Sequence, residues 1–106
     1  MFIMSEWPLL YVFALVTTIN GVPPLNVEPS CRALASFSGS FDLMTRCMKN
    51  EQNARDQLAS QWTQFAAEDK AYCIDLSNIG APSYADLLTC LELARDARAR
   101  REHAAR

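Results

Sequence analysis

The sequence predicts an all-α fold in which a long central helix carries a shorter antiparallel helix folded back at each end, with a disulfide at each corner. Residues 40–76 contain neither Gly nor Pro, and their apolar side chains recur mostly every three or four positions. The gap from Cys31 to Cys47 and the gap from Cys73 to Cys90 are nearly equal in length. Each gap is centred on a turn signal, Ser-Gly-Ser at 38–40 and Asn-Ile-Gly-Ala-Pro at 78–82.

The length and charge of the chain limit its class. A chain of 106 residues makes one small domain, for which disulfides commonly supplement a small core. The net charge is −2, and the excess of arginine after residue 94 is what the end of a helix prefers. We therefore expect no nucleic-acid partner. The expected organisation is an apolar leader at 1–21, a helical domain at 22–98 and a basic tail at 99–106.

The leader has the apolar length of a signal peptide. Residues 7–19 carry no charge and read WPLLYVFALVTTI, followed by Asn20-Gly21 and Pro23-Pro24. This run is short for a membrane span, which needs about 20 residues. We expect an export signal cleaved after Thr18 or Gly21, although no Lys or Arg precedes the run and no Ala-x-Ala follows it. A retained membrane anchor and a segment packed in the core are the alternatives.

Three helices are expected in the domain. The first spans about 29–37, with Pro29 in its first turn. The second spans about 40–76, and its apolar positions are Met44, Cys47, Met48, Ala54, Leu58, Trp62, Phe65, Tyr72, Cys73 and Leu76. Ser83 is the expected N-cap of the third, with Asp86 in the place of the capping-box acid. Its apolar stripe fades toward the arginines, and we expect fraying beyond residue 98.

Helix geometry favours one cysteine pairing. On a continuous central helix, Cys47 and Cys73 would lie about 39 Å apart at 1.5 Å per residue, so they cannot bond. Pairing Cys31 with Cys73 and Cys47 with Cys90 is strained, because both flanking helices would have to overlap the same stretch. We predict Cys31–Cys47 and Cys73–Cys90, each across a turn. Such disulfides persist outside the reducing cytosol.

The same register predicts where the basic end of the third helix lies. If Cys73 faces Cys90, then Arg98 lies near Phe65 and Arg101 near Trp62. We therefore predict that Arg98 and Arg101 shield Trp62 through cation-π contacts.

No residue pattern indicates catalysis or metal binding. His103, the one histidine, lies near the chain end without a predicted partner, as a general base would require. CxxC, HExxH and CxxCH motifs are absent from the sequence. Glu68 and Asp69 are adjacent and point about 100° apart on a helix, so we expect them to be solvated. We expect no enzyme activity, no cofactor and no metal.

Two segments resemble a set of short, exported, uncharacterised alphaproteobacterial proteins. They are ARDQLASQWTQFAAEDKAYC at 54–73 and PSYADLLTCLELARDAR at 82–98. The resemblance implies a disulfide-stapled helical protein outside the cytoplasm, with no activity attached. Trp62, Phe65 and Cys73 are also similar to a pattern of LprI-like lysozyme-inhibitor domains, although the spacing from Trp to Cys is longer in this chain by about one helical turn.

We therefore expect a non-catalytic binding or envelope structural protein, periplasmic or secreted, with a lysozyme-inhibitor-like protein as the alternative. The flanking helices leave the middle of the central helix open, which predicts a contact face there. Its residues are Ala54, Leu58, Trp62 and Phe65. The expected partner is a protein or a second copy of the chain. A membrane is a partner only if residues 1–20 are retained.

Overall fold

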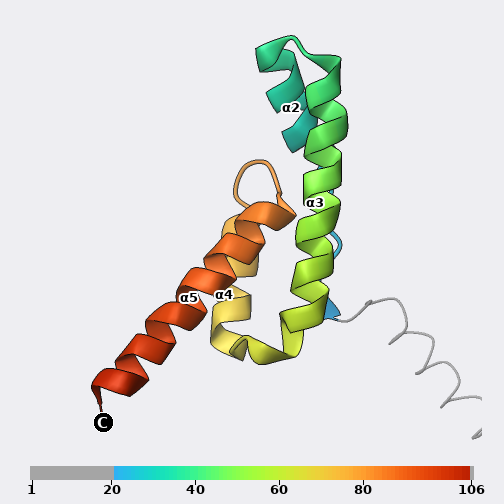
Figure 1. The fold of residues 1–106 in the computed structure, drawn as a ribbon. Helices are drawn as coiled ribbons and strands as arrows, with labels where there is room; N and C mark the ends of the chain where they lie inside the picture. The colour runs from blue at the N-terminus through green and yellow to red at the C-terminus, as the bar shows by residue number, and fades with distance from the viewer. Residues whose placement is uncertain (1–20, 106) are drawn as a thin grey trace, which may run out of the picture.

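The computed structural model describes residues 21–105, which fold into four α-helices and one short 3-10 helix (Figure 1). The predicted leader, apart from Gly21, lies outside the described residues. Within them there is no β-strand, so the all-α prediction is confirmed. The elements are α2 (Glu28–Ser38), α3 (Phe41–Gln61), η2 (Trp62–Gln64), α4 (Ala67–Ser77) and α5 (Tyr84–Ala104).

The helices form two hairpins, each closed by a disulfide. Cys31 on α2 bonds to Cys47 on α3, with their Cα atoms 5.5 Å apart. Cys73 on α4 bonds to Cys90 on α5, with a Cα–Cα distance of 5.8 Å. All four cysteines of the sequence are thereby paired, and the predicted connectivity is confirmed.

Gly39 makes the sharp turn of the first hairpin. Its φ of 70° is left-handed, a conformation that costs glycine little because it lacks a Cβ. Its N–H donates to the carbonyl of Ala35 at 2.9 Å, which ends α2 and lets α3 start two residues later. The Ser-Gly-Ser signal at 38–40 is therefore a turn, as predicted.

The predicted continuous helix over 40–76 is wrong, because it breaks after Gln61. The chain makes one 3-10 turn at 62–64 and then runs extended at Phe65 and Ala66, which have ψ values of 143° and 145°. Figure 1 shows the chain reversing direction at this point, so that α4 leads back toward the middle of α3. The break occurs without Gly or Pro.

Burial of two aromatic side chains accounts for the break. Trp62 and Phe65 are both buried, and the extended backbone at 65–66 lets both enter the core. Because helices in proteins owe most of their stability to tertiary packing, this burial offsets the interrupted hydrogen bonds. The new helix α4 then starts with Glu68 and Asp69 in its first turn, where acids interact favourably with the helix dipole.

The reversal lets α5 pack against both α3 and α4 (Figure 1). A single core forms where these helices meet the segment 22–27. Its buried residues are Val22, Val27, Ala54, Leu58, Trp62, Phe65, Cys73, Tyr84, Leu87, Leu88 and Leu91.

Helix α5 begins as predicted and ends later than predicted. The hydroxyl of Ser83 accepts a hydrogen bond from the Asp86 N–H at 3.2 Å, as an N-cap does. The helix runs to Ala104, so the fraying expected beyond residue 98 is wrong. Alanine and arginine are strong helix formers, and Arg101 and His103 complement the dipole in the last turn.

The predicted shielding of Trp62 by Arg98 and Arg101 is also wrong. Lys70 Nζ lies over the Trp62 ring, 5.1 Å from its centroid. Arg95 lies over the Phe65 ring at 5.3 Å and donates to Gln61 Oε1 at 2.7 Å. Arg98 pairs with Asp69 instead, so the residues that face α5 differ from those predicted for a continuous helix, which is interrupted at 62–66.

None of the described helices is both long enough and apolar enough to span a membrane.

Replacing Leu58 tests the core. Its side chain is 0% exposed, so Leu58→Ala should lower the free energy of unfolding by about 2 to 5 kcal/mol through lost burial and a cavity. The exposed Leu93 on α5 is the matched control, for which Leu93→Ala should change it by less than about 0.5 kcal/mol. Urea unfolding followed by circular dichroism measures both. Equal effects from the two variants would contradict the fold.

Candidate functional site

The predicted contact face is part of the core. Ala54, Leu58, Trp62 and Phe65 are all buried, and the structure brings the four together beneath α5 and the segment 22–27. The prediction of an open face assumed a continuous central helix. Since the helix breaks at Trp62, α5 covers the surface that was expected to be free. These four residues are thus unavailable as a docking surface in the folded chain.

A buried carboxylate holds the start of α5. Glu51 on α3 is 5% exposed and is the only charged side chain that is buried among residues 21–105. Its Oε2 accepts from the backbone N–H of Tyr84 at 2.6 Å and of Ala85 at 3.2 Å. Its Oε1 accepts from the hydroxyl of Ser83. The carboxylate of one helix therefore caps the N-terminus of another, 32 residues later in the chain.

Among residues 21–105, Glu51 forms no ion pair, and its charge is stabilised by hydrogen bonds instead. The first N–H groups of a helix have no acceptor within the helix, and they carry its partial positive charge. Glu51 supplies two acceptor oxygens to these groups, and Ser83 continues the network to the Asp86 N–H. Within the described part of the chain, no buried side-chain nitrogen or oxygen lacks a hydrogen-bond partner.

The N-terminal segment is fastened at the same place. The Tyr84 hydroxyl accepts from the Leu25 N–H at 2.8 Å and donates to the Pro23 carbonyl at 3.2 Å. The Ser30 hydroxyl donates to the Pro82 carbonyl at 2.6 Å. The start of α5 is thus the junction at which the segment 22–27, α2 and α3 all contact the second hairpin.

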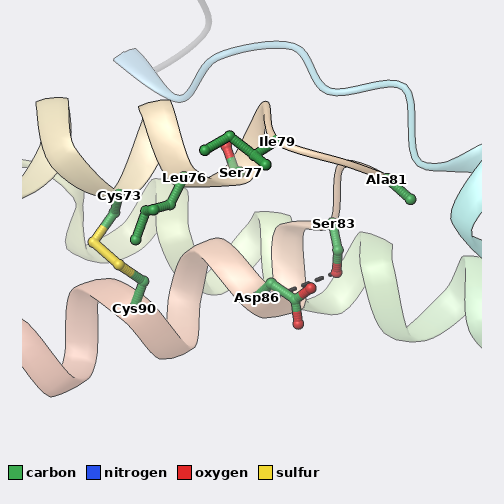
Figure 2. Close-up of a pocket in the computed structure, with 8 residues that line it drawn as sticks. All are labelled: Cys73, Leu76, Ser77, Ile79, Ala81, Ser83, Asp86 and Cys90. Carbon is green, nitrogen blue, oxygen red and sulfur yellow. Dashed lines mark hydrogen bonds between the residues drawn. A yellow bond between two sulfur atoms is a disulfide. The ribbon is translucent and has the colours of Figure 1, made fainter.

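A small cavity lies beside the second disulfide (Figure 2). Its volume is about 210 Å³, and the close-up shows the Cys73–Cys90 bridge at one end and the Ser83–Asp86 cap at the other. The lining residues are Cys73, Leu76, Ser77, Ile79, Ala81, Ser83, Asp86 and Cys90. Both serine hydroxyls have structural partners, since Ser77 donates to the Ile74 carbonyl at 2.7 Å and Ser83 to Glu51.

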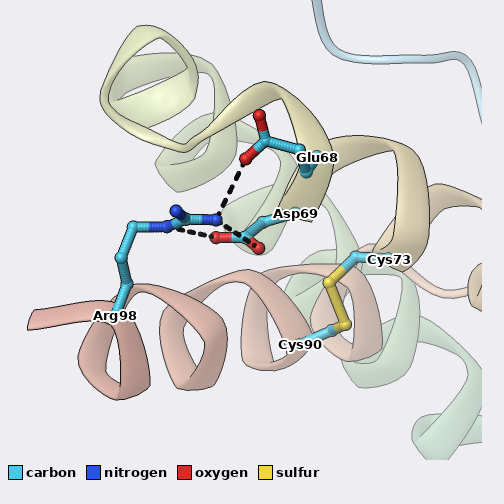
Figure 3. Close-up of polar contacts among 5 residues, drawn as sticks. All are labelled: Glu68, Asp69, Cys73, Cys90 and Arg98. Atoms are coloured by element: carbon cyan, nitrogen blue, oxygen red, sulfur yellow. Dashed lines mark hydrogen bonds and ion pairs between the residues drawn. A yellow bond between two sulfur atoms is a disulfide. The ribbon is translucent and has the colours of Figure 1, made fainter. Parts of the chain in front are cut away.

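Arg98 fastens the outer part of α5 to the start of α4 (Figure 3). Its Nε and one terminal nitrogen bond the two Asp69 oxygens at 3.2 and 3.0 Å, and the same terminal nitrogen contacts Glu68 at 3.2 Å. The hydrogen bonds to Asp69 and the charge of that carboxylate raise the pKa of Arg98 above its ordinary value, and Glu68 adds to the effect. Asp69 was expected to be solvated, and it is half-buried under this pair instead.

The side chains that could act as a general base or bind a metal ion do not cluster in the described part of the chain. His103 lies exposed in the last turn of α5. Across residues 21–105, no group of three or more His, Cys, Asp or Glu side chains is close enough to hold a metal ion.

Among residues 21–105, the two most exposed large hydrophobic side chains lie at the turn of the first hairpin. Phe37 at the end of α2 is 94% exposed and Phe41 at the start of α3 is 87% exposed. Leu34, one turn before Phe37 on α2, is also exposed. We call Leu34, Phe37 and Phe41 the apolar tip. In Figure 1 the turn between α2 and α3 is one end of the molecule, remote from α4 and α5.

Comparison with family models, curated proteins and solved structures finds no significant match.

Sequence reasoning missed both Glu51 and the apolar tip. Glu51 stands among Lys49, Asn50 and Gln52, a setting typical of a solvated helix face. The tip did carry a signal, because Phe37 and Phe41 flank the predicted turn on either side, where core residues are rare.

Removing the Glu51 carboxylate should destabilise the protein. Glu51→Ala leaves the Tyr84 and Ala85 N–H groups and the Ser83 hydroxyl without their acceptor, so we expect a loss of about 2 to 4 kcal/mol in the free energy of unfolding. Asp56→Ala, at an exposed position of the same helix, is the control and should have little effect. Chemical denaturation measures both, and a Glu51→Ala variant as stable as the control would disprove the capping role.

Proposed function

We propose that the chain is an exported, non-catalytic binding or envelope structural protein that contacts its partner through the apolar tip. The observation that carries this proposal is the exposure of Phe37 and Phe41 together, at 94% and 87%, on a hairpin clamped by a disulfide. Soluble proteins rarely gather large apolar side chains on their surface, and where they do, the patch commonly marks an interaction site.

The disulfide behind the tip supports this role. Cys31 and Cys47 lie on the two helices that present Phe37 and Phe41, so the bridge limits how far the tip can rearrange. A contact surface that is already ordered loses less conformational entropy when it binds. The hairpin therefore suits presentation of the tip to a partner.

The disulfides also indicate an oxidising location outside the cytoplasm. The periplasm or the extracellular space is our proposal within that class, and the apolar residues 7–19 are the export signal that it requires.

The polar groups around the cavity support a non-catalytic role. The Ser83 hydroxyl is bonded to Glu51 and to the Asp86 N–H, and the Ser77 hydroxyl is bonded to a backbone carbonyl. A nucleophilic hydroxyl needs a general base within hydrogen-bond reach. Glu51, which accepts from Ser83, is instead committed to two backbone N–H groups at the start of α5.

Mass spectrometry of the protein recovered from separate cell fractions tests the proposal. We expect a periplasmic or secreted chain that starts between residues 19 and 22 and lacks two hydrogens for each of its two disulfides. A chain found reduced in the cytoplasm would refute it.

A lysozyme-inhibition assay on the same material distinguishes the proposed function from the alternative, a lysozyme-inhibitor-like protein. An exported binding protein that contacts something else leaves lysozyme activity unchanged. Inhibition that survives removal of both tip phenylalanines would favour the inhibitor-like function and a different contact surface.

A further inference from the structure

We infer that the Cys31–Cys47 disulfide is a redox-sensitive latch on the residues that it encloses, 32–46, which we call the outer hairpin. When a dithiol reduces this bridge, the outer hairpin loses its ordered structure while the core and the second hairpin stay folded. The apolar tip belongs to the outer hairpin, so reduction removes the contact surface. That last consequence alone rests on the proposed function.

The outer hairpin has no core of its own. None of its residues is buried. Cys31 is the one buried residue of α2, and the buried residues of α3 begin only at Glu51. Figure 1 shows this end of the hairpin standing clear of α4 and α5. Little burial therefore offsets the conformational entropy that these residues lose on folding, and an isolated helix of 11 residues such as α2 is marginal in water.

Polar side chains do not hold α2 on α3 either. Arg32 pairs with Glu28 inside α2. Arg46 pairs with Asp42 inside α3. In the described part of the chain, no side-chain hydrogen bond or ion pair joins one of these helices to the other. The disulfide is therefore the main link between the two sides of the outer hairpin.

The base of the first hairpin is held independently of the bridge. Val27, just before α2, belongs to the core, and the Ser30 hydroxyl donates to the Pro82 carbonyl at 2.6 Å. On the α3 side, Glu51 accepts from the Tyr84 N–H at the start of α5. These contacts remain when the bridge is reduced, so the loss of order is confined to the outer hairpin.

The second disulfide lies in a different setting. Cys73 is part of the core, and Cys90 packs against it. Leu87 and Leu91 of α5 are 0% exposed, and Arg98 binds the first turn of α4. The second hairpin is thus held by buried side chains and an ion pair in addition to its bridge, and these hold α4 on α5 after reduction.

The two bridges close loops of nearly equal length, with sequence separations of 16 and 17. The chain entropy of loop closure is therefore the same for both. The ease of reduction then depends on how closely the protein holds the two thiols together afterwards, because a high effective concentration favours the disulfide. The core keeps Cys73 beside Cys90, whereas the outer hairpin releases Cys31 from Cys47. We therefore expect the first bridge to be reduced more readily.

Reduction begins at Cys47. This residue is partly buried and lines a hollow of about 320 Å³, whereas Cys31 is 0% exposed. A thiolate of the dithiol attacks the Cys47 sulfur and displaces Cys31 as a thiolate. The second thiol of the reductant then attacks the mixed disulfide and releases Cys47. The dithiol ends as a disulfide, and its two electrons and two protons are on the two cysteine thiols.

A redox titration of the oxidised protein tests the latch. The protein is equilibrated with mixtures of reduced and oxidised dithiothreitol, and its free thiols are alkylated and assigned by peptide mass spectrometry. We expect Cys31–Cys47 to be half-reduced at a ratio of reduced to oxidised dithiothreitol at least about tenfold lower than Cys73–Cys90 requires. Equal midpoints, or earlier reduction of Cys73–Cys90, would overturn the inference.

Hydrogen exchange of paired variants tests where order is lost. In Cys31→Ser with Cys47→Ser, the amides of residues 32–46 should exchange at least about tenfold faster, while those of residues 84–91 keep their protection. Cys73→Ser with Cys90→Ser is the matched control, in which residues 32–46 should exchange as in the parent protein. Unchanged protection of residues 32–46 in the first variant, or loss of the whole fold in either variant, contradicts the latch.

The latch and the proposed function fail on different results. Both readouts report the structure of residues 32–46 and require no partner. A cytoplasmic chain, or one that makes its contacts elsewhere, refutes the proposed function and leaves the latch in place. An outer hairpin that stays ordered after reduction refutes the latch and leaves the proposed function in place.

Discussion

Glu51 joins two halves of the molecule that are otherwise held by separate disulfides. Cys31–Cys47 fastens α2 to α3, and Cys73–Cys90 fastens α4 to α5, so neither bridge fixes one hairpin on the other. Each bridge closes a short loop and stabilises its own hairpin by about 3 kcal/mol in the chain-entropy model. The carboxylate of Glu51 binds the start of α5 to α3, and Leu58 of α3 and Leu87 of α5 belong to the same core.

The two ends of the first hairpin have different surroundings. Just beyond the end of α3, Trp62 is buried in the core, while the opposite end of the hairpin carries Phe37 and Phe41 in solvent. A chain of this size has few apolar side chains to spare for its surface, because small domains bury a lower fraction of what their unfolded chains expose. Leaving two phenylalanines outside the core is consistent with their use in a contact, and the nearby disulfide keeps them presented.

Much of the local architecture could be predicted from the sequence, since its signals are local. Both disulfides could be predicted from the spacing of the cysteines together with two local signals, the glycine turn at Gly39 and the N-cap at Ser83. The prediction that Cys47 and Cys73 are too far apart to bond nevertheless relied on a continuous helix, which is interrupted after Gln61. The break at 62–66 carries no Gly or Pro and depends on tertiary burial of Trp62. Glu51 was unpredictable for the same reason, because its partners lie 32 to 34 residues away.

Native-state hydrogen exchange tests the coupling of the hairpins most directly. The amides of Tyr84 and Ala85 donate to Glu51, and the amide of Leu58 lies in the helix that Glu51 belongs to. If the cap joins the hairpins into one cooperative unit, all three amides should exchange through the same global opening, with equal free energies and equal dependence on denaturant. Exchange of Tyr84 and Ala85 at a much lower free energy than Leu58 would contradict the account.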